Sequence, residues 1–333
     1  MSAVRAWTMR GGSLHLATAP GLDATDDTTL IHVRYAGVCG SDIPKLSSSW
    51  RGPVPSPWFP GHEIVGTIAR TVDWVCVDPL IGCRSCPACA DGHVHLCQGL
   101  RRVGWDLPGG LAEAVRVPSA SVVRLPALGD PAHGVLADAM AVAVHGVRCG
   151  LPTRPGRLGV IGTGAVAVCT AICAVRAGWE VHVAARSAVR RDQLHQALSD
   201  VPVAVHQRPL PPCDAVVDAA SGQDDAPLRQ ALSRVRDGGT VVVQNAYAPR
   251  VVLSLPLRDL FRRSITVRGS YSYCRADGRD DFRDALTLLT GGGAWADLLT
   301  KDRYPLLDLP RALSDLRGAD RRRPLKALLT ADS

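Results

Sequence analysis

The sequence predicts an α/β fold in which a doubly wound parallel sheet is joined to a second, mostly β part. Residues 155–270 alternate apolar runs with helical stretches, and strands that alternate with helices form a parallel sheet. Residues 1–150 instead hold short β-like runs broken by glycine and proline, which is typical of an irregular β domain. The expected strands cover residues 30–35, 64–69, 114–117, 157–161, 180–185, 215–218, 240–244 and 265–269.

The change of pattern near residue 150 sets the expected domain boundaries. The 333 residues suffice for two domains of ordinary size. We expect residues 1–150 to form the β domain and residues 151–270 to form the parallel-sheet domain. Residues 271–333 hold a helical stretch at 281–289 and a strand at 325–330, and we expect them to return to the first domain.

Composition argues against several classes of protein. Hydrophobic residues make up 46% of the chain, which is enough for a sizeable core and disfavours disorder. No run of eighteen apolar residues indicates a membrane span, and residues 1–14 lack the apolar region of a secretory signal. We therefore expect a cytoplasmic protein. Its net charge of +7 is spread along the chain, so neither nucleic acid nor a membrane is an expected partner.

A glycine-rich turn predicts a dinucleotide site. Gly162 permits a tight turn after the strand at 157–161, Gly164 lets the backbone approach a pyrophosphate, and Ala167 allows close helix packing. The expected cofactor-binding residues of this turn are Gly162, Gly164, Ala165, Val166 and Ala167. Glycines also occur in strand–turn–helix connections that bind no nucleotide, and this is the alternative.

The end of the next expected strand favours NADP(H) over NAD(H). An NAD site carries an acidic residue about twenty residues after the first glycine, where it holds the ribose 2′-hydroxyl. This chain has Arg186 and Ser187 there, followed by Arg190. A guanidinium group suits a 2′-phosphate. The alternative is that these residues only begin the next helix.

Four closely spaced cysteines predict a structural zinc site. A disulfide framework needs an oxidising compartment, to which nothing in the sequence points. Thiolates spaced as C-x2-C-x2-C-x7-C can surround Zn²⁺ tetrahedrally. Iron–sulfur clusters also use cysteine runs, but the longer last gap and the absence of a following proline disfavour one. The four residues are Cys83, Cys86, Cys89 and Cys97, and His93 and His95 lie between them as expected bystanders.

A second group of motifs carries a family resemblance. GVCGSD at 37–42 and PGHE at 60–63 place Cys39 twenty-three residues before His62. Alone, Cys39 could be a buried thiol and His62 a core histidine. Together with the four cysteines, the glycine-rich turn and GGLAEAVRVP at 109–118, they resemble the zinc-dependent medium-chain dehydrogenase/reductase family over nearly the whole chain. The resemblance, which is closest to alcohol and sorbitol dehydrogenases, implies a Rossmann domain and a GroES-like catalytic domain.

The resemblance also implies two zinc ions per chain, one catalytic and one structural, and roles for single residues. Cys39 and His62 would be ligands of the catalytic zinc, with Glu63 an alternative ligand beside them. Asp42 would orient the imidazole of His62. Ser41 would be the hydroxyl that takes the substrate proton.

Asp138 takes the place of a further catalytic zinc ligand. The run from Asp138 to His145 resembles the Glu-Pro-Leu-Ser-Val-Gly-Val-His segment of sorbitol-type dehydrogenases. Because aspartate is one methylene shorter than glutamate, it could bind zinc directly or through water. The alternative is that Asp138 caps a helix.

The chain departs from the family pattern in two places. Many relatives carry a proton-relay histidine where this chain has Pro44, so the relay would end differently, through Lys45, the cofactor ribose or water. The loop after Gly66 is also about ten residues shorter than in relatives, a difference that we expect to leave the ligands in place.

The resemblance implies an NAD(P)-dependent alcohol dehydrogenase or ketoreductase. We expect a polar secondary alcohol as the small-molecule substrate, namely a polyol, a sugar, or an aminocyclitol or amino sugar. In this mechanism zinc stabilises the alkoxide and hydride passes to nicotinamide. The family implies a homodimer or homotetramer. Two alternatives are a zinc-poor quinone or enone reductase that uses NADPH, and a zinc-ribbon binding protein, which the single cation Arg84 within 83–97 disfavours.

Overall fold

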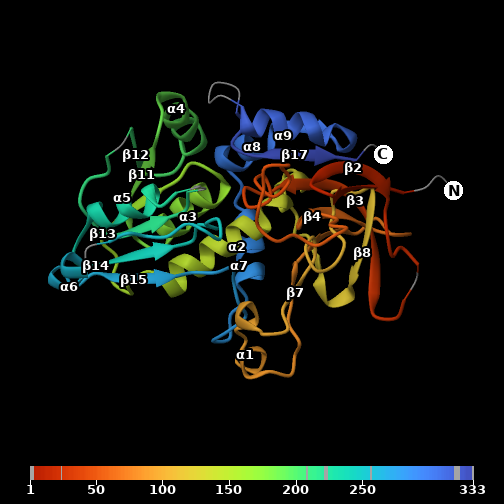
Figure 1. Ribbon diagram of the computed structural model, residues 1–333, viewed down its shortest axis with the longest axis horizontal. Coiled ribbons are helices and arrows are strands. Elements are labelled where there is room, and N and C mark those ends of the chain that lie inside the picture. Colours follow the sequence, from red (N-terminus) through yellow and green to blue (C-terminus); the bar gives the residue numbers. More distant parts are fainter. Residues whose placement is uncertain are drawn as a thin grey trace. The chain divides into compact units, whose positions relative to one another are not determined.

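The computed structural model of the protein describes residues 4–23, 25–207, 209–220, 224–255, 257–318 and 323–331. The chain divides into two compact units (Figure 1). The first unit comprises residues 1–138, 274–292 and 299–333, and the second comprises residues 139–273 and 293–298. Among the described residues, no helix is both long and apolar enough to cross a membrane.

The second unit is built on a parallel sheet. Its strands lie in the order β12-β11-β10-β13-β14-β15, and every neighbouring pair is parallel. Their bounds are β10 Arg157–Ile161, β11 Glu180–Ala185, β12 Val203–Gln207, β13 Cys213–Asp218, β14 Val235–Val243 and β15 Thr266–Gly269. The chain runs outward from β10 to β12 and then returns to the other side of β10, so the strand order reverses between β10 and β13.

Helices connect these strands and pack on the sheet. Helix α3 contacts β10 and β11, and α5 contacts β13 and β14. The central strands β10 and β13 form because their residues are nearly all apolar and buried on both faces, as a sheet covered by helices requires. The helices of this unit are α2 Ala137–His145, which begins at the unit boundary, α3 Ala165–Arg176, α4 Ala188–Ala197, α5 Ala226–Arg234, α6 Leu257–Arg262 and α8 Ala294–Thr300, whose last two residues belong to the first unit.

The first unit is built on a mostly antiparallel sheet. The long strand β3 pairs with β4, β8 and β17, so residues from both ends of the chain meet on it. A cluster of buried apolar side chains fills the core, and the indole of Trp58, which is 1% exposed, donates to the Gly104 carbonyl at 2.6 Å.

The remaining elements of the first unit are short. Its strands are β1 Arg5–Arg10, β2 Ser13–Thr18, β3 Thr28–Val38, β4 Glu63–Ile68, β5 Trp74–Val77, β6 Leu80–Ile81, β7 Arg101–Arg102, β8 Ala114–Pro118, β9 Val122–Arg124, β16 Arg303–Pro305 and β17 Ala327–Thr330. Its α-helices are α1 Pro87–Ala90, α7 Asp281–Leu289 and α9 Leu309–Arg317.

Candidate functional site

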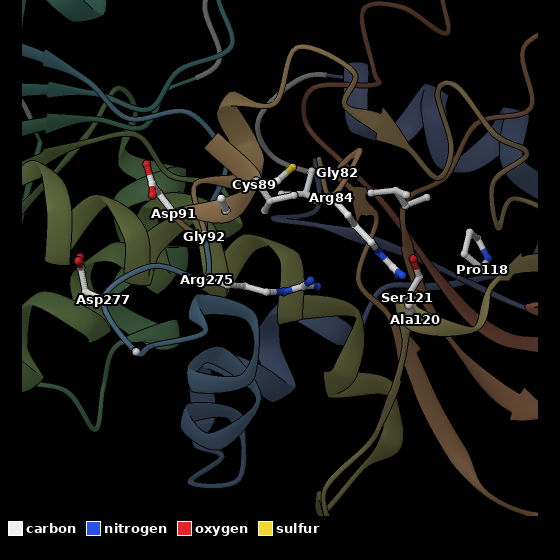
Figure 2. A pocket seen from close by; sticks show the side chains of 15 residues that line it. Gly82, Arg84, Cys89, Asp91, Gly92, Pro118, Ala120, Ser121, Arg275 and Asp277 are labelled. Atoms are coloured by element: carbon white, nitrogen blue, oxygen red, sulfur yellow. The ribbon is translucent and has the colours of Figure 1, made fainter. Parts of the chain in front are cut away.

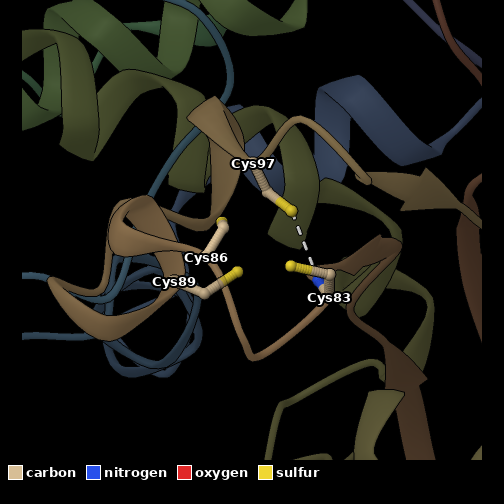
Figure 3. Close-up of side chains that lie close together, drawn as sticks. All are labelled: Cys83, Cys86, Cys89 and Cys97. Carbon is tan, nitrogen blue, oxygen red and sulfur yellow. Dashed lines mark hydrogen bonds between the residues drawn. The ribbon is translucent and has the colours of Figure 1, made fainter.

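The four cysteines of the segment 83–97 converge. Their sulfur atoms lie within 4.8 Å of one another, and Figure 3 shows them directed toward a common space. The backbone N–H of Cys83 also donates to the sulfur of Cys97 at 3.3 Å. All four thiols are free rather than joined as disulfides. Four convergent sulfurs without a disulfide fit a tetrahedral thiolate-binding metal such as Zn²⁺.

Two glycines let this segment, hereafter the cysteine lobe (residues 82–97), fold tightly. A Cβ atom at Gly82 would lie 2.7 Å from the sulfur of Cys89, so any larger residue would crowd the cluster. Gly92 has φ +77°, and a Cβ there would overlap the carbonyl of Arg275. The N–H of Arg275 donates to the Gly92 carbonyl at 2.8 Å. The lobe is therefore fixed to the segment that begins at residue 274.

A pocket of about 530 Å³ lies beside the cysteine lobe. Figure 2 shows Arg84, Ser121 and Arg275 among its lining side chains. None of the expected catalytic residues lines it. The Arg275 guanidinium is already paired with Asp78 and, at 3.4 Å, with Asp280, so its charge is neutralised within the protein.

The bystanders of the lobe also approach another cysteine. Donor atoms of His93, His95 and Cys274 lie within 4.8 Å of one another. The two imidazole rings meet edge to face, with centroids 5.9 Å apart.

A second convergent group holds three of the expected catalytic residues. Donor atoms of Cys39, His62 and Glu63 lie within 4.8 Å of one another, although they come from two segments. Cys39 directly follows β3, and Glu63 begins β4, where it pairs with Gly37. A Cβ at Gly37 would lie 2.1 Å from Oε2 of Glu63, so glycine is needed to make room for this carboxylate.

Asp42 lies beside His62 and contacts its imidazole ring. Oδ2 of Asp42 lies 3.2 Å from Nδ1 of His62, so the other ring nitrogen, Nε2, can face the donor atoms of Cys39 and Glu63. Oδ1 of Asp42 lies 3.7 Å from Nζ of Lys45. Burial raises the pKa of Asp42, but His62 and Lys45 outweigh burial and lower it on balance. Burial likewise lowers the pKa of His62, but Asp42 and Cys39 outweigh it and hold this pKa well above its usual range.

Glu63 has a partner that sequence reasoning missed. Nζ of Lys326 lies 2.5 Å from Oε2 of Glu63, and the two side chains are 3% and 1% exposed. Lys326 immediately precedes β17, which lies beside β3. Burial lowers the pKa of Lys326, but Glu63 outweighs it and raises the pKa on balance. The only signal in the sequence is a lysine, one of three in the chain, at the start of an apolar strand.

Asp138 approaches the group from α2. Its Oδ2 lies 3.8 Å from Nε2 of His62, and burial raises its pKa to about 6. The alternative in which Asp138 caps a helix is wrong. The helical run begins earlier, at Pro131, and Oδ1 of Asp130 caps it by accepting from the N–H of Ala132 at 2.9 Å. Asp138 instead lies in the first turn of α2, with its side chain turned to His62.

Ser41 lies beside Cys39 in the turn after β3. Its hydroxyl donates to the sulfur of Cys39 at 3.2 Å. This turn is closed by the N–H of Asp42, which donates to the Cys39 carbonyl at 3.0 Å. Ser41, Asp42 and Cys39 are therefore held together by one tight turn.

The glycine-rich turn in the second unit has the geometry of a phosphate-binding loop. Gly162 has φ +140°, and a Cβ there would lie 2.6 Å from the Ala219 carbonyl. Gly164 is exposed and precedes the first residue of α3, and a Cβ there would meet no atom within 4 Å. Ala165 and Val166 open α3, and Ala167 is fully buried against the sheet. The open space at a helix N-terminus suits an anion.

The three residues after β11 differ in their surroundings. Arg186 is exposed, and Ser187 caps α4 by accepting from the N–H of Arg190 at 3.3 Å. Arg190 is only 6% exposed, and its guanidinium donates to Gln193 at 2.8 Å. Arg186 is therefore the guanidinium that is open to a ligand, whereas Arg190 is engaged within α4.

A family model matches the first unit. The alcohol dehydrogenase GroES-like domain matches residues 25–127, which contain the cysteine lobe and three of the convergent donors. The chain is 29% identical over 307 residues to an L-galactonate-5-dehydrogenase of Escherichia coli, covering 85% of this chain and 86% of that one. It is also 29% identical over 327 residues to a D-altritol 5-dehydrogenase of Agrobacterium fabrum, covering 90% and 91%.

A solved structure shows the same fold. A zinc-binding dehydrogenase from Sinorhizobium meliloti, bound to NADP, superposes with a TM-score of 0.82 over 99% of this chain and 100% of that one. The two sequences are 24% identical, so this likeness concerns the fold alone. It confirms the expected class, a Rossmann-like parallel sheet joined to a GroES-like domain.

Proposed function

The chain belongs to the zinc-dependent medium-chain dehydrogenase/reductase family, and we propose that it interconverts a polar secondary alcohol and its ketone with a nicotinamide cofactor. The observation that carries the proposal is the convergence of Cys39, His62 and Glu63, with Asp138 beside them. The two relatives are named for L-galactonate and D-altritol, which are polyhydroxylated compounds. We therefore favour a polyol, a sugar or sugar acid, or an aminocyclitol as the substrate.

The donor set fits a catalytic zinc. A thiolate, an imidazole and carboxylates are the ligands that Zn²⁺ prefers, and zinc–nitrogen and zinc–oxygen bonds of about 2.1 Å place neighbouring tetrahedral donors about 3.4 Å apart. The 3.8 Å between His62 and Asp138 is close to that separation. Cys39, His62 and either Asp138 or Glu63 would hold the ion, and the cysteine lobe would hold a second, structural zinc.

The chemistry divides between the cofactors and the protein. When bound, zinc supplies a positive charge that stabilises the substrate oxygen, and nicotinamide exchanges the hydride. Ser41, which lies beside Cys39, would take the proton of the substrate hydroxyl while its own hydroxyl proton passes on to water or to the cofactor ribose. Asp42 fixes the ring of His62, and Lys45 neutralises Asp42. Lys326 holds one oxygen of Glu63 and leaves Oε1 available.

The second unit supports a bound dinucleotide. Gly162 and Gly164 provide the turn and the open space for a pyrophosphate. We assign the 2′-phosphate of NADP(H) to Arg186, because it is exposed and no acidic residue directly follows β11 to repel a phosphate. The variant Arg186→Ala should weaken NADPH binding by roughly 10- to 100-fold and leave NADH binding unchanged, since it removes one charge-assisted contact.

Metal content and substrate turnover test the proposal together. We expect two zinc ions per purified chain by mass spectrometry, and NADP⁺-dependent oxidation within a panel of polyols, sugar acids and amino sugars. The variant Cys39→Ala should lose one zinc and the activity. A single zinc that survives Cys39→Ala but not Cys83→Ala would overturn the proposal, as would chelator-insensitive reduction of quinones or enones by NADPH.

A further inference from the structure

One buried amide in the second unit lacks hydrogen-bond partners. Oδ1 and Nδ2 of Asn245 are both shielded from solvent, and neither forms a hydrogen bond with any residue that the structure describes. Leaving buried polar atoms unpaired costs free energy, so native proteins seldom do so without a reason. A ligand that arrives with its own donor and acceptor is one such reason.

Asn245 lies at the edge of the sheet where parallel strands present ligand-binding groups. It follows the end of β14 by two residues, and the preceding N–H, of Gln244, donates to the Asp218 carbonyl at the end of β13 at 3.0 Å. In open parallel sheets, ligands bind outside the carboxyl ends of the strands, at the point where the strand order reverses. That point lies between β10 and β13, next to β14.

The neighbours of Asn245 are anchored, although its own amide is not. The side chain of Gln244 donates to the Val142 carbonyl at 2.8 Å and accepts from Thr170 at 3.2 Å. The phenol of Tyr247 donates to the buried carboxylate of Asp218, and its N–H donates to the Asn245 carbonyl at 3.1 Å. Burial and the Asp218 carboxylate raise the pKa of the Tyr247 phenol. The nearby Asn245 amide offsets part of this shift, although it does not meet the phenol in hydrogen-bond geometry.

The position of Asn245 selects one half of a dinucleotide. A bound dinucleotide would place its pyrophosphate at Gly162 and Gly164, after β10, and its adenosine half toward β11 and Arg186. The loop after β13 adjoins the glycine-rich turn, because a Cβ at Gly162 would lie 2.6 Å from the Ala219 carbonyl. The other half must cross the reversal point toward β13 and β14, where Asn245 lies.

We infer that the side-chain amide of Asn245 binds the carboxamide of the nicotinamide ring. Two primary amides are complementary, since each offers an N–H donor and a carbonyl acceptor, and together they form a pair of hydrogen bonds. Both orphaned atoms of Asn245 would then be satisfied. This inference rests on the proposed function, because it assumes a nicotinamide dinucleotide in the second unit.

Calorimetric titration of the full chain with three ligands tests the inference. The ligands are NADP⁺, its 3-acetylpyridine analogue, which lacks the amide N–H₂, and 2′-phospho-ADP-ribose, which lacks the ring. The variant Asn245→Ala should bind NADP⁺ about tenfold more weakly, because two neutral hydrogen bonds are lost. It should bind 2′-phospho-ADP-ribose as the unchanged chain does, which also shows that it is folded.

The acetyl analogue separates a direct contact from a general loosening. The unchanged chain should prefer NADP⁺ to the analogue by several-fold, and Asn245→Ala should lose that preference. Gln230→Ala is the matched control, because Oε1 of Gln230 is also buried without a partner among the described residues, but it lies within α5 and not after a strand of the sheet. It should keep the preference.

The outcomes separate the two proposals. If the unchanged chain binds neither NADP⁺ nor NAD⁺, the proposed function fails. If the unchanged chain binds NADP⁺, and Asn245→Ala binds NADP⁺ and its 3-acetylpyridine analogue with the same affinities as the unchanged chain, only the Asn245 inference fails. The inference is also wrong if Gln230→Ala abolishes the same preference, or if Asn245→Ala changes the substrate KM without changing the affinity for NADP⁺.

Discussion

The two convergent ligand groups of the first unit are assembled in different ways. The cysteine lobe takes four sulfurs from the short segment 83–97, and the lobe is shaped by its own glycines. The other group takes the thiol of Cys39 from the end of β3, and the imidazole of His62 and the carboxylate of Glu63 from the start of β4. Asp138 approaches this group from α2. The second group is accompanied by charged side chains that pair directly with its members or with one another, namely Asp42, Lys45 and Lys326.

This difference is the one expected between a structural metal site and a catalytic one. Four thiolates complete the coordination of a tetrahedral ion and leave no position for a substrate, whereas three mixed donors leave one open. A local site also depends on one loop, whereas a distributed site depends on the whole sheet being folded. Damage to the lobe should therefore reduce stability first, and damage to the Cys39 group should reduce turnover first.

The largest expected effect is that of Cys39→Ala on turnover. Removing this ligand should lower kcat/KM by at least about a thousandfold, because the several kcal/mol of charge stabilisation supplied by the metal is lost. The melting temperature should fall little, since Cys39 is only partly buried and lies in a turn. Steady-state kinetics, calorimetry and metal analysis measure the three quantities.

The matched lobe variant Cys97→Ala should give the opposite pattern. It should lose the other zinc, expose the lobe to limited proteolysis, and keep measurable turnover at low temperature. Cys274→Ala should leave the metal count unchanged, which excludes a contribution from His93, His95 and Cys274. If both cysteine variants lose activity and stability equally, the contrast between the two groups is wrong.

The next largest effect is that of Lys326→Met on stability. Removing Lys326 would leave the buried Glu63 carboxylate unpaired, which should cost about 3–5 kcal/mol in the free energy of unfolding. Lys301→Met, at an exposed position, should change it by less than about 0.5 kcal/mol. The double variant Glu63→Gln, Lys326→Met should recover part of the loss. Urea unfolding that finds equal costs at positions 326 and 301 would contradict this expectation.

Much of the fold could be predicted from local pattern. The expected bounds of the strands at 157–161 and 180–185 and of the helix at 281–289 match β10, β11 and α7, because apolar runs there end at clear turn or cap residues. The strand β12, Val203–Gln207, was missed because it lies at the sheet edge and none of its residues is fully buried. Edge strands need no continuous apolar run.

The candidate sites could be predicted only where spacing carries the signal. The cysteine lobe is visible in the sequence because its four donors share one segment. Lys326 was missed because its partner, Glu63, is 263 residues away and the two meet only through the pairing of β3 with β4 and β17. Asn245 was missed because an unpaired buried amide has no sequence pattern; it is recognised only once the surroundings are known.

A smaller effect is expected for Asp42→Asn. The amide oxygen of the introduced asparagine would accept from Nδ1 of His62 as a neutral group and would no longer pair with Lys45, so His62 would be held less firmly. Replacing such an outer partner typically costs 10- to 100-fold in metal affinity or activity. Chelator competition and kcat/KM measure both. Asp106→Asn, which breaks a more exposed pair with Arg102, is the control and should leave both unchanged.

The smallest effect should come from Ser85→Ala, the corresponding change in the cysteine lobe. The Ser85 hydroxyl donates to the sulfur of Cys83 at 3.5 Å, and both residues are exposed, so water can replace the contact. We expect a change within about 0.5 kcal/mol in the free energy of unfolding and full retention of the lobe zinc. Gly82→Ala, whose Cβ would crowd Cys89, should release that zinc far more readily. If Ser85→Ala lowers the metal affinity of the cysteine lobe as much as Asp42→Asn lowers that of the Cys39 group, then residues that contact the ligands matter equally at the two sites. The contrast between a closed local site and an open distributed one would then concern only the metal ligands.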